Sequence, residues 1–426
     1  MKINNVYGTK KFIFNLYLKI RVFFTYFPKI FTGQIDLKGF IIFIKRLLVF
    51  IKILQHNKFV SINKETKIDL YVPGFPTKAF LTACNKFLVF NEKLPCTVAL
   101  ISITSKCRFN CQHCYQRFDR GRDVNIKKLV ETVRILQDKG VAFFNIEGGE
   151  PFLEYGRLVK LCEAIDSRSE IWVNSTGDGI TRDRLIELRK NNVKGIIFSL
   201  HNPDKNRFNE FMGNSEAFNI MEKGINLCHK ENMVVAFNSC LLKDDFYNGN
   251  FEKIMSLSKS YNSSILQIIK PKPSGAWLNN DDLMFSNKDI KNAKTKINMY
   301  NSNKEYSDYP SISAQIIEES KEVFGCTAGG TDRLYINAKG DLQPCEFLNI
   351  SFGNIEKDDF NIIYNKMRLV FENPCECMIC EKYSKSINTI YKKNKLNSLP
   401  VTPELSKEIY KNWDRENETK LYKKLK

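Results

Sequence analysis

The chain has 426 residues, and its 43% hydrophobic and 12% aromatic content excludes wholesale disorder. At about 100–200 residues per domain, this length suggests two to four domains. Sixty-five basic and 47 acidic residues give a net charge of +18, which favours anionic partners: nucleic acid, anionic lipid or an acidic substrate. Thirteen Cys is an odd number, which excludes a fully paired disulfide framework. With no secretory signal evident, we expect a reducing cytoplasm, where clustered Cys typically bind metal or do redox chemistry.

Residues 1–70 are expected to form a basic, amphipathic helical extension. The first 60 residues contain eleven Lys or Arg and one acidic residue, Asp36. In the apolar run from 39 to 54, a helix would carry one narrow basic stripe, formed by Lys38, Lys45 and Lys52. Such a helix can lie in a membrane interface. It can equally pack on the next domain and extend its Lys side chains into solvent. Peripheral membrane contact through residues 1–60 is therefore one of two hypotheses.

Residues 71–96 read as a connector, and residues 97–278 alternate short apolar runs with amphipathic stretches. The expected strands are Val98–Thr104, Ala142–Ile146, Ile171–Val173, Gly195–Leu200, Val234–Asn238 and Ile265–Ile269. The expected helices between them include Ile126–Lys139, Leu153–Asp166, Arg182–Lys190 and Ala217–Glu231. Six strands in this alternation predict an α/β fold with a parallel sheet, open or barrel-like. The reactive site of such a sheet lies at the C-terminal ends of its strands.

The remaining third of the chain has a different character. Residues 279–320 are polar and predict a helix and a linker. Residues 321–395 form a small Cys-rich α+β domain that opens on a hairpin. The charged tail, residues 396–426, predicts a solvated helix.

A Cys-rich loop directly follows the first expected strand. Its three thiols, Cys107, Cys111 and Cys114, have the spacing C-x3-C-x2-C. A structural zinc site takes four ligands, which this loop could complete only with His113. A 4Fe–4S cluster held by three Cys instead leaves one iron open for a substrate or cofactor. Both metals remain open on spacing alone.

The Cys loop, followed by Tyr115, resembles the cluster motif of the radical S-adenosylmethionine (SAM) superfamily. A second motif, Glu147-Gly148-Gly149-Glu150-Pro151, follows the second expected strand. It is similar to that superfamily's GGEP motif, whose backbone contacts the amino group of SAM. Glycines permit such a close backbone approach. The resemblance covers roughly residues 97–275 and implies a partial (βα)6 TIM-like barrel.

The resemblance also implies further SAM contacts at later strand ends. Asn174, Ser175 and Thr176 match the ribose-contacting segment, and Ser199 matches a position that contacts the carboxylate or ribose. Asn238 and the turn Pro273-Ser274-Gly275 are similar to adenosine-contacting positions. Polar caps at strand ends are the alternative interpretation for all of these. Glu147, Asp178 and Tyr115 lie near the expected mouth, but no acid or base is assigned.

The implied mechanism is reductive. Cys107, Cys111 and Cys114 ligate three irons, the fourth iron chelates SAM, and a reduced cluster cleaves SAM to methionine and a 5′-deoxyadenosyl radical. That radical abstracts hydrogen from the substrate, while the barrel orients SAM and excludes water. An electron donor such as flavodoxin or ferredoxin is the implied partner.

Five Cys form a second constellation in residues 321–395: Cys326, Cys345, Cys375, Cys377 and Cys380. Cys326, Gly340 and Cys345, with the spacing C-x13-G-x4-C, resemble the opening of the SPASM auxiliary domain, found in radical SAM enzymes that often modify peptides or proteins. The full SPASM pattern has seven Cys for two clusters, so the five here imply one auxiliary iron–sulfur cluster, as in the shorter twitch variant. Zinc is the alternative for a four-Cys site. The other thiols are expected in the core: Cys84, Cys96, Cys162, Cys228 and Cys240.

The function favoured by these motifs is radical modification of a peptide or protein side chain. A lipid or membrane-bound intermediate is an alternative substrate that would explain the basic N-terminus. RNA is a further alternative that would use the positive charge, although no RNA-binding module is recognisable. A non-catalytic zinc or iron–sulfur binding module is the alternative of a different class, but it leaves the Gly-Gly-Glu-Pro motif unexplained.

Overall fold

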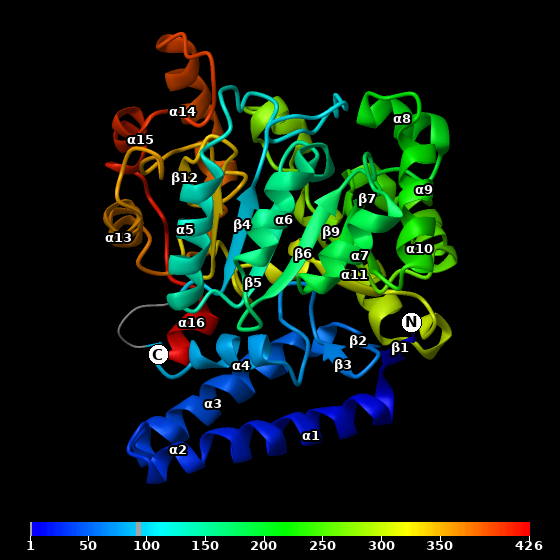
Figure 1. The fold of residues 1–426 in the computed structure, drawn as a ribbon, viewed down its shortest axis with the longest axis vertical. Helices are drawn as coiled ribbons and strands as arrows, with labels where there is room; N and C mark the ends of the chain where they lie inside the picture. Colours follow the sequence, from blue (N-terminus) through cyan, green and yellow to red (C-terminus); the bar gives the residue numbers. More distant parts are fainter. Residues whose placement is uncertain (1, 91–94) are drawn as a thin grey trace.

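A computed structural model describes residues 2–90 and 95–426 of the chain (Figure 1). Its main sheet has nine strands in the order β10-β9-β8-β7-β6-β5-β4-β11-β12. The six central strands are parallel and follow the chain: β4 (Val98–Ser102), β5 (Phe143–Glu147), β6 (Glu170–Ser175), β7 (Val193–Ser199), β8 (Val234–Cys240) and β9 (Ile265–Ile269). The predicted partial barrel of six βα units is confirmed.

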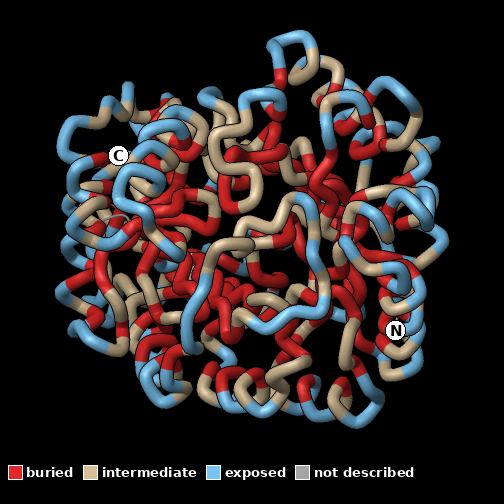
Figure 2. Tube along the Cα trace, turned by 90° about the horizontal axis from the view of Figure 1, so that it is seen from above, coloured by how far each residue is buried: buried red, intermediate tan, exposed pale blue. Residues whose placement is uncertain are grey.

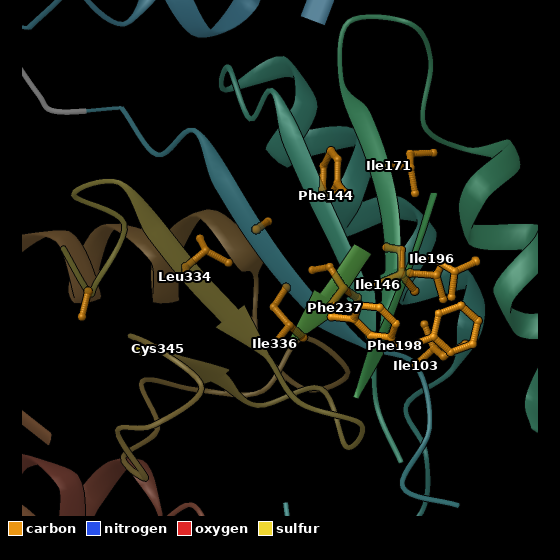
Figure 3. Close-up of a cluster of buried hydrophobic side chains, with 14 of the residues drawn as sticks. Ile103, Phe144, Ile146, Ile171, Ile196, Phe198, Phe237, Leu334, Ile336 and Cys345 are labelled. Carbon is orange, nitrogen blue, oxygen red and sulfur yellow. The ribbon is translucent and has the colours of Figure 1, made fainter. Parts of the chain in front are cut away.

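Helices cover the outer face of this sheet. They are α5 (Ile126–Asp138), α6 (Tyr155–Glu163), α7 (Arg182–Lys190), α8 (Lys205–Met212), α9 (Ala217–Lys230) and α10 (Asn250–Ser260). Strand side chains alternate between faces, as a pleated strand requires. On β4, Ala99 and Ile101 belong to the outer cluster, while Val98 and Leu100 belong to an inner one. Figure 3 shows part of the outer cluster, with Phe144, Ile146 and Ile171 packed on neighbouring strands.

The barrel interior changes from apolar to polar along the strands. On β5, the side chains on the inner face are Phe143, then Asn145, then Glu147. On β6, Trp172 belongs to the apolar inner cluster, and Asn174 follows two residues later. The strand starts therefore form a mostly apolar floor, and the strand ends form a polar mouth. A polar ligand is expected to bind at that mouth.

Three strands outside the expected six extend the sheet. Strand β10 (Ser311–Ala314) pairs in parallel with β9, in a segment that we expected to contain only a helix and a linker. Strand β11 (Arg333–Ile336) pairs in parallel with β4, and β12 (Leu342–Gln343) completes the expected hairpin. The Cys-rich segment is thus joined to the barrel by backbone pairing and not by a flexible tether.

The N-terminal segment is more than a helical extension. It contains α1 (Gly8–Tyr26), α2 (Pro28–Phe31) and α3 (Leu37–Ile53), but also an antiparallel sheet of β1 (Ile3–Val6), β2 (Phe59–Ile62) and β3 (Glu65–Lys67). The expected connector contains α4 (Lys78–Asn85), and its residues 91–94 lie outside the described residues. Figure 1 shows these elements at the end of the barrel opposite α8.

The floor of the barrel is filled by this N-terminal segment. Val60, Ile62 and Leu70 belong to the inner apolar cluster, together with residues at the starts of the barrel strands. Lys67 pairs with Glu170 at the first residue of β6, and both side chains are buried. The Tyr71 hydroxyl donates to Gln267 Oε1 on β9. The N-terminal segment and the barrel therefore share one packed core.

The C-terminal helices enclose the remaining sides. They are α11 (Asn287–Ser302), α12 (Gln315–Glu318), α13 (Phe360–Val370), α14 (Ile379–Lys393), α15 (Pro403–Tyr410) and α16 (Lys420–Leu425). The short 3₁₀ helices are η1 (Leu54–His56), η2 (Pro151–Glu154), η3 (Lys243–Phe246), η4 (Gly275–Trp277), η5 (Asp281–Leu283) and η6 (Lys304–Tyr306). The tail is not simply solvated, because Leu421, Tyr422 and Leu425 are buried against the N-terminal helices. Figure 2 shows buried segments gathered in the middle of the fold and exposed ones at its rim.

Within residues 2–90 and 95–426, no helix combines the length and the apolar character that crossing a bilayer requires.

Candidate active site

A cavity with about 760 Å³ of empty space, including its opening to solvent, lies at the mouth of the barrel. That size is typical of small-molecule sites. Strand ends and the loops after them supply its walls. It is lined by His113, Tyr115, Glu147, Gly148, Gly149, Asn174, Ser175, Thr176, Ser199, His201, Asn238, Cys240, Ile269, Lys272, Trp277 and Phe347. Seven of the residues predicted to contact the cofactor are therefore in one cavity: Gly148, Gly149, Asn174, Ser175, Thr176, Ser199 and Asn238.

The Cys loop after β4 is held by the C-terminal end of α8. The Asn110 amide donates to Met212 O at 3.1 Å, and the Gln112 amide donates to Phe211 O at 2.9 Å. A side chain at Gly213 would place its Cβ 2.5 Å from Asn110 O, so this close packing requires glycine. The loop is therefore anchored on a rigid element and presents its thiols in a fixed arrangement.

The three thiols of the loop differ in exposure. Cys107 is exposed, and Cys111 and Cys114 are half-buried. Burial raises the pKa of Cys107 to about 11, and it also raises the pKa values of Cys111 and Cys114. Thiols are therefore the favoured form in the metal-free protein, and binding iron would release their protons. Among residues 2–90 and 95–426, no three His, Cys, Asp or Glu side chains are close enough to share a single metal ion.

The Gly-Gly-Glu-Pro segment packs its backbone directly on the Cys loop. A Cβ at Gly149 would lie 2.2 Å from Lys106 O, and Gly148 has a φ of +150°. The Gly149 amide donates to Thr104 O, and the Glu150 amide donates to Lys106 O. These contacts leave no room for side chains at the two glycines. The cavity is consequently walled here by bare backbone, which fits a ligand that needs close main-chain contact.

Glu150 and Pro151 lie behind the cavity wall and do not line it. Glu150 is fully buried, and its carboxylate accepts from the Ser175 hydroxyl at 2.9 Å and from the Thr176 amide at 2.7 Å. Burial raises the pKa of Glu150 to about 7, although these hydrogen bonds oppose the shift. Glu150 therefore joins the loop after β5 to the loop after β6 and positions Ser175 and Thr176.

The polar wall carries buried atoms that have no partner in the protein. They are Asn174 Oδ1, Asn238 Oδ1, His113 Nδ1 and His201 Nε2. The Cys240 amide donates to His201 Nδ1 at 3.0 Å, so the ring hydrogen of neutral His201 is on Nε2. The cavity thus offers amide acceptors and an imidazole donor to a polar ligand. SAM, with its amino, carboxylate, ribose and adenine groups, fits this set of donors and acceptors.

Glu147 lies at the centre of a hydrogen-bonded group. Its Oε1 accepts from the Tyr115 hydroxyl at 2.6 Å, and its Oε2 accepts from Asn145 and Asn174 Nδ2. Burial raises the pKa of Glu147 to about 8, against the opposing hydrogen bond from Tyr115. Burial therefore favours the protonated form of Glu147, at the wall of the cavity. Tyr115 and Glu147 both line the site, while Asp178 pairs with Arg108 outside it.

Several lining residues were not found by sequence reasoning. His201, Lys272, Trp277 and Phe347 carry no motif and lie far apart in the chain. His113 contacts His201 at a ring-centroid distance of 4.3 Å and stacks on Phe211. Burial lowers the pKa of His113 to about 4 and that of His201 well below its usual range, so both rings are neutral. The one available signal was the position of His201, two residues after Ser199 at the end of β7.

The turn Pro273-Ser274-Gly275 does not line the cavity but links three parts of the site. The adjacent Ala276 amide donates to Cys114 O at 3.0 Å. From the Cys-rich domain, Asn349 Oδ1 accepts from the Ser274 hydroxyl and the Gly275 amide. The turn therefore couples the Cys loop to the C-terminal domain.

The five C-terminal thiols lie together in the Cys-rich domain. Cys326 and Cys375 face each other across a two-residue antiparallel bridge, and Cys375 Sγ is 3.8 Å from Cys377 Sγ. The hydrogen bond with Cys375 lowers the pKa of Cys326 to about 6. Burial raises the pKa values of Cys380 and Cys345, and neighbouring thiols add to this. The charge of Cys326 raises the pKa of Cys380, and that of Cys380 raises the pKa of Cys345. All five thiols expected in the core are buried, and Cys240 also lines the cavity.

Comparison with known families gives two matches. The family model of the radical SAM superfamily matches residues 101–255. The family model of SPASM, an iron-sulfur cluster-binding domain, matches residues 326–382. The first match contains the Cys loop and the strand ends up to β8, and the second contains all five C-terminal thiols.

Curated relatives with known reactions are distant. GTP 3′,8-cyclase of Aquifex aeolicus is 25% identical over 280 residues, which cover 59% of this chain and 82% of the cyclase. AdoMet-dependent heme synthase of Nitratidesulfovibrio vulgaris is 21% identical, with coverage of 64% and 79%. Among solved structures, Streptococcus suis SuiB bound to precursor peptide SuiA has a TM-score of 0.54 at 15% identity, covering 80% of this chain and 77% of SuiB. At that identity the likeness shows a common fold.

Proposed function

Because the chain is a radical SAM enzyme with a C-terminal SPASM domain, we propose that its substrate is a side chain of a peptide or protein. The cofactors are a 4Fe–4S cluster, SAM and auxiliary iron–sulfur. The observation that carries the proposal is that Phe347, from the SPASM region, lines the same cavity as the barrel strands. Its ring meets Tyr115 edge-on at a centroid distance of 5.7 Å. A substrate at this mouth would contact both domains.

The residues of the site divide into three roles. Cys107, Cys111 and Cys114 hold the cluster, and the backbone at Gly148 and Gly149 meets the amino end of SAM. The ribose, carboxylate and adenosine contacts belong to Asn174, Ser175, Thr176, Ser199 and Asn238. When bound, the cluster and SAM supply a 5′-deoxyadenosyl radical after one-electron reduction. The chain's own residues orient that reaction and exclude water from the inner half of the cavity.

Tyr115 and Glu147 lie between the SAM-contacting wall and Phe347. Burial disfavours the carboxylate of Glu147 and raises its pKa, while the hydrogen bond from Tyr115 partly offsets this shift. Asn145 and Asn174 fix the orientation of that carboxyl group. We assign Tyr115 and Glu147 the role of positioning the substrate next to the radical.

The auxiliary cluster is assigned to Cys326, Cys345, Cys375, Cys377 and Cys380, four of which suffice for one 4Fe–4S cluster. Flavodoxin or ferredoxin would deliver the electron from the solvent side, in the cytoplasm. The peptide assignment is supported by the fold shared with SuiB, whose solved complex contains its precursor peptide. Contact with a membrane is a separate proposal, because it depends on the N-terminal helices and not on the cavity.

The test uses anaerobically reconstituted, dithionite-reduced full-length protein, with 5′-deoxyadenosine as the readout. Cys111→Ala removes one cluster ligand, and Cys162→Ala removes a buried thiol of the outer core as the matched control. We expect cleavage of SAM in the wild type and the control and none in Cys111→Ala. Cleavage by Cys111→Ala at the wild-type rate would contradict the assignment of the loop.

Substrate class is tested with the same preparation. A pool of unstructured peptides of varied composition is incubated with SAM, and mass spectrometry detects SAM-dependent changes in peptide mass. GTP is the comparison substrate, because GTP 3′,8-cyclase is a relative. We expect altered peptide and unaltered GTP. Consumption of GTP, with no change in any peptide, would overturn the peptide proposal and leave the radical mechanism intact.

A further inference from the structure

Helix α1 has two apolar faces, only one of which packs on the protein. Leu18, Val22 and Tyr26 are fully buried against the rest of the N-terminal helices. The Tyr26 ring lies 4.4 Å from that of Phe43 on α3. This inward face accounts for the attachment of α1 to the fold. The opposite face requires a different explanation.

The outward face of α1 is apolar from Phe12 to Phe24. At about 100° per residue, Leu16 and Ile20 lie about 200° around the helix from Leu18, on the side away from the protein. The exposed apolar side chains of α1 are Phe12, Ile13, Leu16, Tyr17, Ile20, Phe23 and Phe24. Phe12 and Phe24 retain 70% and 66% of their surface exposed. A solvated helix face would carry polar residues at these positions.

The exposed apolar surface continues onto α2 and α3. Phe31, beside the turn between these helices, is 79% exposed, and Leu37 is 60% exposed. Ile41 and Leu48 add to it. Of the seventeen large apolar side chains that are exposed among the described residues, eleven lie on these three helices. We call these eleven residues the α1–α3 apolar surface. Concentration of this kind marks an interaction site, not ordinary surface variation.

Basic side chains border the α1–α3 apolar surface. On α1, Lys19 is exposed on one side of the apolar stripe, and Lys10 and Arg21 are exposed on the other. On α3, the predicted stripe of Lys38, Lys45 and Lys52 is exposed. Asp36 is the one acidic residue among the first 60. An apolar face with basic borders is the pattern of a helix that lies in the plane of an anionic membrane surface.

We infer that the α1–α3 apolar surface docks the enzyme on an anionic lipid bilayer. The apolar side chains enter the headgroup–acyl boundary, and the basic side chains meet lipid phosphates. A second copy of the chain is a poorer occupant, because it would place like-charged borders opposite each other. This attachment goes beyond the proposed function and does not depend on it.

Docking in this way gives the active site a fixed direction. In Figure 1, α1 lies at one end of the barrel and α8 lies at the other. The Cys loop is anchored on the end of α8. The mouth of the barrel therefore faces away from the bilayer, toward the aqueous phase.

The test is flotation of the full-length protein with vesicles of phosphatidylcholine, with or without about 30% phosphatidylglycerol, at about 0.1 M salt. We expect flotation with the anionic vesicles and at least about tenfold weaker partitioning to the neutral ones. Raising the salt to about 0.5 M weakens the electrostatic part of the binding.

Two variants separate the contributions of the apolar and the basic side chains to vesicle binding. Phe12→Gln/Ile20→Gln/Phe24→Gln removes apolar side chains that are already exposed, so folding is retained, and we expect at least about tenfold weaker partitioning. Lys10→Gln/Lys19→Gln/Arg21→Gln removes three charges, each worth about fivefold, so we expect a loss on the order of 100-fold.

Matched controls carry the same substitutions elsewhere. Ile362→Gln/Leu369→Gln alters two equally exposed apolar residues on α13, and Lys127→Gln/Lys160→Gln/Lys190→Gln alters three exposed Lys on α5–α7. Both controls should float like the wild type. SAM cleavage in solution should be unchanged in all of these proteins.

Three outcomes overturn the inference. The wild type fails to float with anionic vesicles, or the apolar triple variant floats as well as the wild type does. The third is a concentration-dependent dimer, seen by light scattering, that the apolar triple variant abolishes, since a second copy would then cover this surface.

Discussion

Asn349 Oδ1 of the SPASM domain accepts hydrogen bonds from the Ser274 hydroxyl, at 2.9 Å, and from the Gly275 amide, at 3.1 Å. One amide oxygen therefore fixes the turn that follows β9, and that turn packs on Cys114 and Tyr115. All partners in this contact are buried. The geometry of the Cys loop thus depends on a side chain more than 200 residues later in the chain.

Replacing Asn349 should weaken both the fold and the site. Asn349→Ala leaves two buried donors without an acceptor, which costs about 1–3 kcal/mol for each group. We expect a lower thermal unfolding midpoint and a higher KM for SAM. Asn349→Asp retains the acceptor and should lie closer to the wild type in KM. A KM for SAM in Asn349→Ala equal to that of the wild type would show that the turn does not position the loop.

Gly149→Ala tests the close approach of backbone to the Cys loop. The added Cβ would lie 2.2 Å from Lys106 O, which neither chain segment can accommodate without moving. We expect loss of SAM binding, measured by equilibrium dialysis. Gly156→Ala on α6 is the control, because its Cβ meets nothing within 4 Å. That control should be neutral or slightly stabilising, by about 0.5–1 kcal/mol.

Replacing one partner of the Lys67–Glu170 ion pair in the barrel floor should lower the stability of the protein strongly. Glu170 accepts from Lys67, from Trp172 Nε1 at 2.6 Å and from the Gly74 amide. Glu170→Gln leaves the buried Lys67 charge without a counter-ion, which destabilises by about 3–5 kcal/mol. Urea unfolding measures the change, with Glu163→Gln on the exposed side of α6 as control. The double variant Lys67→Met/Glu170→Gln should recover part of the lost stability, because it also removes the unpaired Lys67 charge. A double variant whose loss equals the sum of the losses of the two single variants would contradict a coupled pair.

A buried carboxyl group in the floor predicts a pH dependence. Burial, and then the nearby charge of Glu318, raise the pKa of Asp69 to about 7 from its usual 3.8. Between these two values the unfolded chain releases a proton that the folded chain keeps, so stability falls as pH rises from about 4 to about 7. His56 contributes in the same direction: burial lowers its pKa, but the hydrogen bond and charge of Glu318, the hydrogen bond to the Ile53 carbonyl and the charge of Asp69 together raise it overall.

Asp69→Asn removes this titration. As the pH increases from 5 to 8, the unfolding midpoint of the wild type should fall relative to that of Asp69→Asn. The exposed Asp282→Asn on η5 should show a constant difference over the same range. A pH-independent difference for Asp69→Asn would contradict the raised pKa.

Iron content tests the assignment of the auxiliary thiols. Cys345→Ala removes a buried thiol of the SPASM domain and should lower bound iron by about four atoms per chain. Reductive cleavage of SAM should persist, because the Cys loop is a separate ligand set. Cys162→Ala should retain all iron. Unchanged iron in Cys345→Ala would exclude Cys345 as a necessary ligand.

Sequence reasoning predicted the barrel well because its strands are continuous apolar runs. Strand β9 was placed at Ile265–Ile269, as the structure has it. The site residues Asn174, Ser199 and Asn238 were also accessible, since parallel strands end at one edge and these polar residues occur near strand ends. Local pattern was sufficient wherever neighbours in sequence determine the element.

The failures all involve contacts between distant parts of the chain. Strand β10 reads Ser-Ile-Ser-Ala, which has no apolar run, and it exists because β9 offers an open edge. The burial of α16 depends on three residues among many Lys, which pack on helices at the other end of the chain. Phe347 and His201 reach the site only through tertiary packing, so no sequence motif identifies them as site residues.

Because the N-terminal segment fills the floor of the barrel, ligands reach the cavity from the mouth. Cofactor, substrate and both products then share a single route, and whatever binds outermost blocks whatever lies beneath it. SAM, at the inner wall, would bind first and its products would leave last. Ordered binding, with methionine competing against SAM and a substrate that traps SAM in place, is the kinetic signature of such a one-ended chamber.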